Sequence, residues 1–207
     1  MNKTQPAIVL ASASPRRQDL LRSIGIEFQV IPSNVDETVL ADETPTNLVL
    51  RLSEEKATEV AQRAGIAGRW FIGSDTIVVC DTQILGKPTS PQDSASMLRQ
   101  LSGRTHQVLS GYTIIDRRAN IRLRRCVTTE VTFRTLTDQE IEGYIASGEP
   151  ADKAGSYAIQ GLGSYIVTSI NGSYTNVVGL PLAQIVTDLK QLGAIELFAH
   201  TQEMTQQ

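Results

Sequence analysis

Hydrophobic and polar positions follow two periods along this chain, and each change of period marks a new element. Short apolar runs and strict alternation predict strands over residues 7–11, 27–31, 70–80, 108–115, 121–133 and 165–170. Apolar positions three and four residues apart predict helices over residues 15–24, 45–64, 91–102, 138–146 and 180–192. The first four helices follow a Ser or Thr N-cap, and proline occupies the first position of three of them.

The order of these elements indicates the fold class. Strands and helices alternate early in the chain, whereas the strands over 108–115 and 121–133 are joined by the short polar segment 116–120, as in an antiparallel hairpin. This mixture predicts an α/β fold with a mixed, twisted sheet flanked by helices. A chain of 207 residues without repeats or a linker is expected to form one two-lobed domain.

The charge balance narrows the classes of partner. With 22 acidic and 19 basic residues the net charge is -3, which argues against a nucleic-acid or membrane surface because both need excess Lys and Arg. A small polyanionic ligand remains compatible with this net charge, because a local cluster of cations is enough to bind it. We find no leader pattern and no apolar run of membrane-spanning length, so we expect a cytoplasmic protein. Cys80 and Cys126 lie in predicted strands without ligand-like spacing, which predicts buried thiols.

The junction between the first strand and the first helix is a candidate anion site. Ser12, Ser14, Arg16 and Arg17 surround the helix N-terminus, where unpaired N–H groups and the helix dipole favour phosphate oxygens. Two cations in the first turn oppose the dipole at a cost of about 0.3–1 kcal/mol each, which favours a functional role. The alternative is a well-capped surface helix with solvated arginines.

Carboxylates supply a second set of candidates. Asp75 interrupts a very apolar strand beside Gly73, and a buried charge there needs a partner or a metal. Its alternative is a strand-end hydrogen bond or a bend at Gly73. Glu37 lies in the polar segment 33–43, which has the composition of an exposed loop, and judged alone it is a solvated loop residue.

Turns supply the remaining charged candidates. Glu149, Asp152 and Lys153 share a turn rich in Gly and Pro, a composition suited to Mg²⁺ and an adjacent phosphate, although ordinary ion pairing explains it too. Lys87 lies in a tight turn from which it could reach a cleft, whereas Lys56 judged alone belongs to the solvated face of a helix. No Gly-x-x-x-x-Gly-Lys loop, dinucleotide glycine triad or Ser-His-Asp order is present.

Seven strings, taken in order, resemble the Maf family of septum-formation inhibitors and nucleoside triphosphate pyrophosphatases. They are Leu10-Ala-Ser-Ala-Ser-Pro-Arg-Arg17, Ser74-Asp-Thr-Ile-Val78, Gly86-Lys-Pro88, Leu101-Ser-Gly-Arg-Thr-His106, Gly148-Glu-Pro-Ala-Asp-Lys-Ala-Gly155, Ala158-Ile-Gln-Gly161 and Val177-Val-Gly-Leu-Pro181. The resemblance covers about residues 8–192, which gives a domain over 1–192 and a frayed or accessory tail over 193–207. It implies a fold like inosine triphosphatase, with the active cleft between two lobes, and it suggests a homodimer.

The resemblance also implies a reaction and roles for residues. The reaction is metal-dependent attack of water on the α-phosphorus of a nucleoside triphosphate, with Mg²⁺ as the expected metal and Mn²⁺ as an alternative. Asp75 would accept the proton of that water, and Arg16, Thr76 and Gln160 would set base preference. The metal and phosphate contacts that it implies are Glu37, Lys56, Lys87, Glu149, Asp152 and Lys153.

Gln160 resembles the branch of the family that acts on dTTP and UTP, because an amide can both donate to and accept from a pyrimidine edge. Two positions depart from the common pattern. Ser74 replaces an alanine, and Gly86 stands where a glutamate can precede the lysine, which leaves the number of metal ions open. The sequence also leaves open whether Asp75 acts as a base or mainly holds a metal that acidifies the water.

Two other functions remain in competition. One is a hydrolase of other nucleotides, such as ITP, XTP or 7-methyl-GTP, on the same scaffold. The second is a nucleotide-binding regulator of cell division without turnover. A missing charge in the cleft would favour the regulator, and the sequence lacks none of the charges that the resemblance implies.

Overall fold

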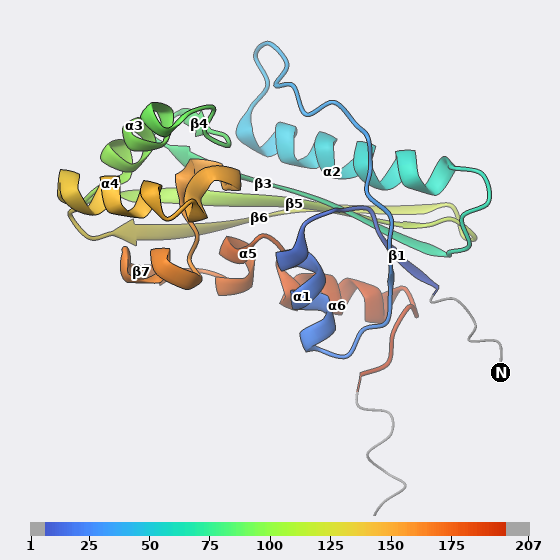
Figure 1. Cartoon of the computed structure of the whole chain (residues 1–207). Helices are drawn as coiled ribbons and strands as arrows, with labels where there is room; N and C mark the ends of the chain where they lie inside the picture. The colour runs from blue at the N-terminus through green and yellow to red at the C-terminus, as the bar shows by residue number, and fades with distance from the viewer. Residues whose placement is uncertain (1–6, 198–207) are drawn as a thin grey trace, which may run out of the picture.

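A computed structural model describes residues 7–197 of the chain, which form a mixed seven-stranded sheet between helices (Figure 1). The strands lie in the order β2-β1-β3-β5-β6-β7, and β4 pairs with β3 off this path. Only the pairs of β1 with β2 and with β3 are parallel. The strand bounds are β1 Ile8–Leu10, β2 Gln29–Val30, β3 Trp70–Cys80, β4 Gln83–Leu85, β5 Thr105–Asp116, β6 Ile121–Phe133 and β7 Val167–Asn171. The predicted mixed sheet and its antiparallel hairpin, β5–β6, are confirmed.

Helices cover both faces of this sheet. Figure 1 shows α2 along one face and α1 and α6 along the other, with α3 and α4 near β4 at one end. Their bounds are α1 Pro15–Ser23, α2 Pro45–Gln62, α3 Pro91–Leu101, α4 Asp138–Ala146, α5 Tyr174–Val178 and α6 Leu182–Gln191. Three 3-10 turns, η1 Glu149–Asp152, η2 Ala154–Ser156 and η3 Gly161–Tyr165, connect α4 to β7.

The helix starts lie where the sequence predicts them. Ser14, Thr44 and Ser90 cap α1, α2 and α3 through their side-chain oxygens. Thr137 and Glu140 form the predicted capping box of α4, with bonds in both directions. β4, α5 and the 3-10 turns were not predicted, because each is too short to show a hydrophobic period.

The bend at Gly73 that was considered as an alternative is absent. β3 runs without a break from Trp70 to Cys80, and Gly73 instead lets α2 approach the sheet. A Cβ atom at this position would lie 2.1 Å from the carbonyl oxygen of Ser53 and 2.6 Å from the backbone nitrogen of Ala57. Because Lys56 lies between these two contact points on α2, the close approach brings it over β3.

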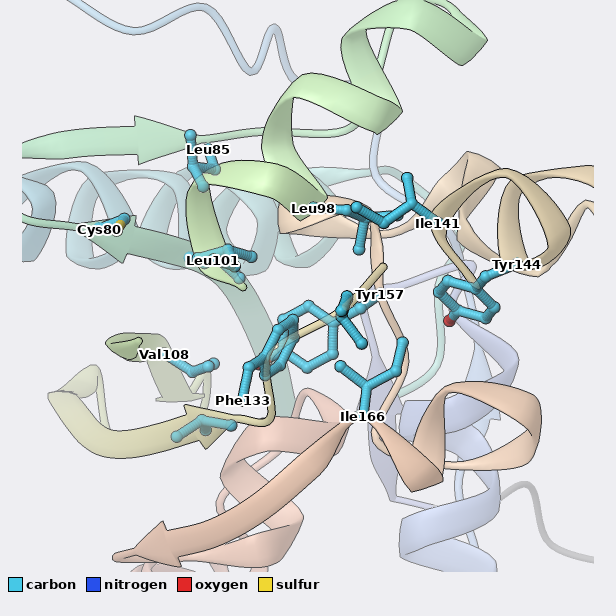
Figure 2. Close-up of a cluster of buried hydrophobic side chains, with 13 residues drawn as sticks. Cys80, Leu85, Leu98, Leu101, Val108, Phe133, Ile141, Tyr144, Tyr157 and Ile166 are labelled. Carbon is cyan, nitrogen blue, oxygen red and sulfur yellow. The ribbon is translucent and has the colours of Figure 1, made fainter. Parts of the chain in front are cut away.

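The core at the end of the sheet near α3 and α4 is aromatic in part. Figure 2 shows Phe133 and Tyr157 in a cluster of buried side chains with Tyr144 nearby. The rings of Phe133 and Tyr157 pack edge to face, with their centroids 4.6 Å apart. His106 packs against both rings, and its Nε2 lies 2.8 Å from the hydroxyl of Tyr157. This core therefore supports the chain that follows η2.

The two cysteines and the C-terminal segment can be compared with the predictions made for them. Cys80 is buried and Cys126 half-buried, and both are free thiols as predicted. Ala194, Ile195 and Leu197 of the expected tail pack against the core beside α6, so this part of the tail is not frayed, while residues 198–207 lie outside the described residues. Within residues 7–197 no helix combines the length and apolar character needed to cross a bilayer.

Candidate functional site

A cleft of about 620 Å³ opens where β3 meets the N-terminus of α1, the segment before α2 and the turns η1 to η3. Its lining combines residues from eight separate parts of the chain, including β3, α2 and the loop that carries Lys87. Every residue that the sequence predicts for the site lines this cleft except Glu149. The fold therefore gathers charges that lie far apart in the sequence.

A buried lysine between two carboxylates forms one wall of the cleft. Nζ of Lys56 lies 2.6 Å from Oδ1 of Asp75 and 2.6 Å from Oε1 of Glu37. The Lys56 side chain is 6% exposed and that of Asp75 11%, so the suggestion of a solvated lysine is wrong and Asp75 has the partner that its burial requires. Burial alone would raise the pKa of Glu37, but the hydrogen bond and charge of Lys56 outweigh it and leave that pKa below its ordinary value.

The loop that carries Glu37 is fastened to α2 by charged side chains. Arg51 of α2 pairs with Glu43 at 2.7 Å and donates to the carbonyl oxygen of Thr38. Glu59, two turns further along, accepts a hydrogen bond from the backbone of Asn34. Both ends of the exposed loop are thus fixed to the helix that supplies Lys56, and this fixes Glu37 in front of Asp75.

Arg17 is turned into the protein beneath the cleft. Its guanidinium donates to the carbonyl oxygens of Gly179 and Ser74 at 2.9 and 2.8 Å, and to the hydroxyls of Thr76 and Ser12 at 3.1 and 3.3 Å. Burial lowers the pKa of Arg17, while the charges of Asp75 and Glu37 oppose that effect. Arg17 thus joins α1, β3 and the turn after α5, and most of its donors are used within the protein.

Arg16 and Lys153 meet at another part of the cleft wall. Nη1 of Arg16 lies 3.6 Å from Oδ2 of Asp152, and Nζ of Lys153 pairs with the other oxygen of the same carboxylate. The pKa of Asp152 lies below its ordinary value because the hydrogen bond and charge of Lys153 outweigh the opposing effect of burial. Two cations therefore face one exposed carboxylate here, which leaves a net positive charge at this wall.

The hydroxyl candidates are engaged in hydrogen bonds within the protein. Thr76 Oγ1 lies 2.8 Å from Ser110 Oγ and 3.3 Å from the carbonyl oxygen of Gly179, in addition to its bond from Arg17. Ser12 Oγ accepts from the backbone of Ser14, and Ser14 Oγ caps α1. These three side chains line the cleft and also fix its floor.

Lys87 and Gln160 are candidates whose side chains make no ion pair or hydrogen bond found among the described residues. Both are exposed, and both line the cleft. The charge of Lys87 contributes to the lowered pKa of Glu37, which places this cation on the side of the carboxylates. No hydrogen-bond partner of the Gln160 amide is found among the described residues, so its donors and acceptor are available to a ligand.

The four carboxylates predicted as metal ligands do not come together. Glu149 lies outside the cleft, with its carboxylate bound to Tyr144 and to the amides of Leu162 and Gly163. Asp152 is paired instead with Arg16 and Lys153. No group of three or more His, Cys, Asp or Glu side chains able to hold a metal is found in the described part of the chain. Glu149 therefore lies apart from the other three carboxylates, and its role as a metal ligand stays a prediction.

Two carboxylates of the predicted set do fit a hard cation. Oxygens of Glu37 and Asp75 approach the same ammonium at 2.6 Å each and line the cleft together. Mg²⁺ commonly takes one or two carboxylates from the protein and completes its shell with water and substrate phosphates. The donor chemistry of this pair fits such a site.

Some residues that shape the site were missed. The string from Val177 to Pro181 carries part of the resemblance with no role for any of its residues, yet the carbonyl oxygen of Gly179 accepts from both Arg17 and Thr76. Asn176, which is fully buried, donates to the carbonyl of Val108 and to Thr129 and so holds α5 on the sheet. A backbone carbonyl leaves no signal in the residue type.

Comparisons with known proteins agree on one family. The model of the family described as "Maf-like protein" matches residues 7–192. A protein of Syntrophotalea carbinolica named dTTP/UTP pyrophosphatase is 58% identical over 192 residues, which cover 93% of this chain and 87% of that protein. A protein of the same name from Geobacter sulfurreducens is 51% identical, covering 91% of this chain and 97% of the relative. One from Geotalea uraniireducens is 50% identical, covering 95% and 100%.

Proposed function

The chain belongs to the Maf-like family, and from this membership we propose that it is a nucleoside triphosphate pyrophosphatase that hydrolyses dTTP and UTP to the monophosphate and pyrophosphate. The observation that carries the proposal is the convergence of Arg16, Lys87 and Lys153 on the cleft that also holds Asp75. Relatives named dTTP/UTP pyrophosphatase at 50–58% identity support the choice of substrate.

The cations fit the charge of the substrate. A nucleoside triphosphate carries roughly four negative charges at neutral pH, and phosphoryl transfer depends mainly on positioning and charge stabilisation. Arg16, Lys87 and Lys153 lie in the cleft with exposed or partly exposed side chains and bind the phosphates. Arg17 acts from below by fixing the strand-to-helix junction, because its donors are used by backbone and hydroxyl oxygens.

Glu37 and Asp75 would hold the divalent metal, with Mg²⁺ as the proposed ion and Mn²⁺ as a substitute. When bound, the metal neutralises phosphate charge and lowers the pKa of a bound water. Lys56 contacts both carboxylates and keeps them facing the same point. Asp75 orients the attacking water and accepts its proton.

The reaction follows from this placement. The water oxygen forms a bond to the α-phosphorus, the bond from that phosphorus to the bridging oxygen breaks, and pyrophosphate leaves with the electron pair. The positive charges of Lys87 and Lys153 stabilise the charge that develops on the leaving group. Gln160 lines the same cleft, and its unpartnered amide binds the polar edge of the pyrimidine. Because the substrate belongs to the pool of free nucleotides, the proposed location is the cytoplasm.

A pyrophosphate-release assay over dTTP, UTP, CTP, ITP and 7-methyl-GTP, with and without Mg²⁺, tests the proposal. We expect dTTP and UTP to have the highest kcat/KM, and turnover to require the metal. A clear preference for ITP or 7-methyl-GTP would refute the substrate choice and the role of Gln160.

The assay also separates the enzyme from a regulator that only binds a nucleotide. An Asp75→Asn variant is expected to lose turnover by about 10²–10⁴-fold. Absence of turnover in the wild-type protein, with dTTP bound in a direct binding measurement, would favour the regulator.

A further inference from the structure

The backbone on both sides of Gln160 is held by two side chains outside the cleft. Before Gln160, the amide of Ala158 donates to the hydroxyl of Tyr144 at 3.0 Å. After it, the amides of Leu162 and Gly163 donate to the carboxylate of Glu149 at 2.9 and 2.8 Å. Gln160 lines the cleft, and its side-chain amide has no hydrogen-bond partner among the described residues. The backbone is therefore fixed on both sides of this residue.

Glu149 and Tyr144 form one unit. The Tyr144 hydroxyl donates to Oε1 of Glu149 at 2.8 Å while it accepts from Ala158, so the two side chains connect both ends of the segment. Tyr144 is 4% exposed and belongs to the buried cluster in Figure 2, which makes it a rigid support. The segment is thus held by the core and not by its own exposed residues.

The Glu149 carboxylate is specialised for accepting amide hydrogens. Burial alone would raise its pKa, but the hydrogen bonds from Gly163, Leu162 and Tyr144 outweigh burial and lower the pKa below its ordinary value. The first amides of a helical turn have no partner within the turn, and this carboxylate satisfies two of them in η3. Gly161 has a φ of +71°, which favours glycine, and a Cβ atom there would lie 2.4 Å from Oε2 of Glu149, so another residue would be strained and would displace the carboxylate.

The same residue also fixes a cation of the cleft. The backbone carbonyl oxygen of Glu149 accepts a hydrogen bond from Nζ of Lys153 at 3.1 Å. Through its backbone carbonyl, Glu149 therefore contacts Lys153, the proposed phosphate-binding residue. Through its carboxylate, it contacts the segment that carries Gln160. These two contacts fix the phosphate and base subsites relative to each other.

A fixed backbone matters because a glutamine amide is ambiguous. Rotation by half a turn exchanges its donor and its acceptor, so a freely placed glutamine could pair equally well with thymine and with cytosine. Discrimination requires that the amide reach the base from a defined position. Backbone hydrogen bonds on both sides of Gln160 supply that position.

We propose that Glu149, supported by Tyr144, is a positioning residue that sets the preference for thymine and uracil over cytosine by fixing the backbone around Gln160, and that it is not a metal ligand. The proposal rests on the proposed function, because it assigns the structural basis of that activity's specificity. It concerns base recognition alone, so it leaves the metal requirement of the enzyme to Glu37 and Asp75.

The test compares Glu149→Gln with Glu142→Gln, the same substitution at an exposed position of α4. The new amide NH₂ of Glu149→Gln cannot accept from an amide N–H, so at least one backbone bond is lost at nearly constant size. We expect the ratio of kcat/KM for dTTP to that for dCTP to fall by about tenfold in Glu149→Gln, and to stay at the wild-type value in Glu142→Gln. The Mg²⁺ concentration for half-maximal turnover is expected to change by less than about twofold.

Two results would overturn the proposal. One is a rise of about tenfold or more in the Mg²⁺ requirement of Glu149→Gln, which would make the carboxylate a metal ligand. Another is an unchanged dTTP to dCTP ratio in a folded variant. If Glu149→Gln does not fold, as judged by circular dichroism, Tyr144→Phe removes a single hydroxyl of the same unit. It is expected to lower the ratio in the same direction, and an unchanged ratio there would overturn the proposal as well.

Hydrogen exchange separates this proposal from the proposed function. The amides of Leu162 and Gly163 should exchange faster in Glu149→Gln than in wild type, and that of Ala158 faster in Tyr144→Phe, whatever the substrate. A wild-type protein that shows no preference for dTTP would refute the proposed function, yet the exchange measurement would still decide whether Glu149 fixes the segment. Unchanged exchange in a folded Glu149→Gln variant would refute the positioning role alone.

Discussion

Nζ of Lys56 lies 2.6 Å from Oδ1 of Asp75, and both side chains are almost completely buried at the wall of the cleft. The pair joins α2 to β3 at the point where Gly73 allows the helix to approach the strand. A contact this close between a buried cation and a candidate catalytic carboxylate makes the stability and the activity of the protein depend on the same two residues.

Removing the cation of this pair should destabilise the fold. Lys56→Met leaves the buried carboxylate of Asp75 without its partner, so the free energy of unfolding should fall by about 3 kcal/mol in denaturant titrations. The double variant Lys56→Met with Asp75→Asn should recover part of that loss, because the unpaired charge is gone. Neither variant should release pyrophosphate from dTTP. Strictly additive losses in the double-mutant cycle would show that the two residues are not coupled.

Arg17 and Arg16 should respond differently to the same substitution. Arg17→Lys loses the planar fork that reaches backbone and hydroxyl oxygens on α1, β3 and the turn after α5, and the free energy of unfolding should fall by about 3 kcal/mol. Arg16→Lys alters one partly exposed ion pair at 3.6 Å and should cost less than about 0.5 kcal/mol. Equal losses measured by thermal or denaturant unfolding would contradict a bracing role for Arg17.

Glu37→Gln should act on metal binding. The variant keeps the size of the side chain but removes one of two anionic oxygen donors, so the Mg²⁺ concentration that gives half-maximal turnover should rise by about tenfold or more. The matched control is Glu27→Gln, since Glu27 is an exposed residue outside the cleft. Titration of Mg²⁺ at saturating dTTP measures the effect, and an unchanged requirement would remove Glu37 from the metal site.

Gln160→Met should change specificity without changing stability. Gln160 is exposed and has no hydrogen-bond partner within the described part of the chain, so the melting temperature should stay at the wild-type value. Loss of the amide should lower kcat/KM for dTTP by about tenfold or more, with a smaller loss for ITP. A uniform loss over all nucleotides would show that Gln160 does not read the base.

His106 should make the fold sensitive to moderate acid. Burial lowers the pKa of His106 to about 4 from its ordinary 6.5, so between these values the unfolded chain binds a proton that the folded protein does not. The contribution of the neutral imidazole to stability is thus complete above pH 6.5 and declines as the pH falls towards 4. Denaturant titrations over this range should show a shallower decline in His106→Asn than in wild type, and parallel curves would contradict the assignment.

Local physics accounts for what could be predicted from the sequence. Ser14, Thr44 and Ser90 each precede a proline, and a cap followed by a fixed φ specifies a helix start without help from the rest of the chain. The alternation in 108–133 likewise predicts two paired strands, because a strand with a buried face needs a period of two. Asp75 was found by the same kind of reasoning, since a charge is unusual in an apolar strand, whereas Lys56 and Glu37 entered the site only through the resemblance to the family.

The sequence by itself therefore determined where most helices begin, which of the longer segments are strands and that Asp75 carries a charge into apolar surroundings. Only the tertiary structure decided the partners: Lys56 is buried against Asp75, Arg17 is turned inward, and Glu149 holds the backbone around Gln160. The reason is that hydrophobic period and capping act over a few residues. The partner of a charge, in contrast, depends on which distant segments the packing of α2 and η3 brings within hydrogen-bond distance.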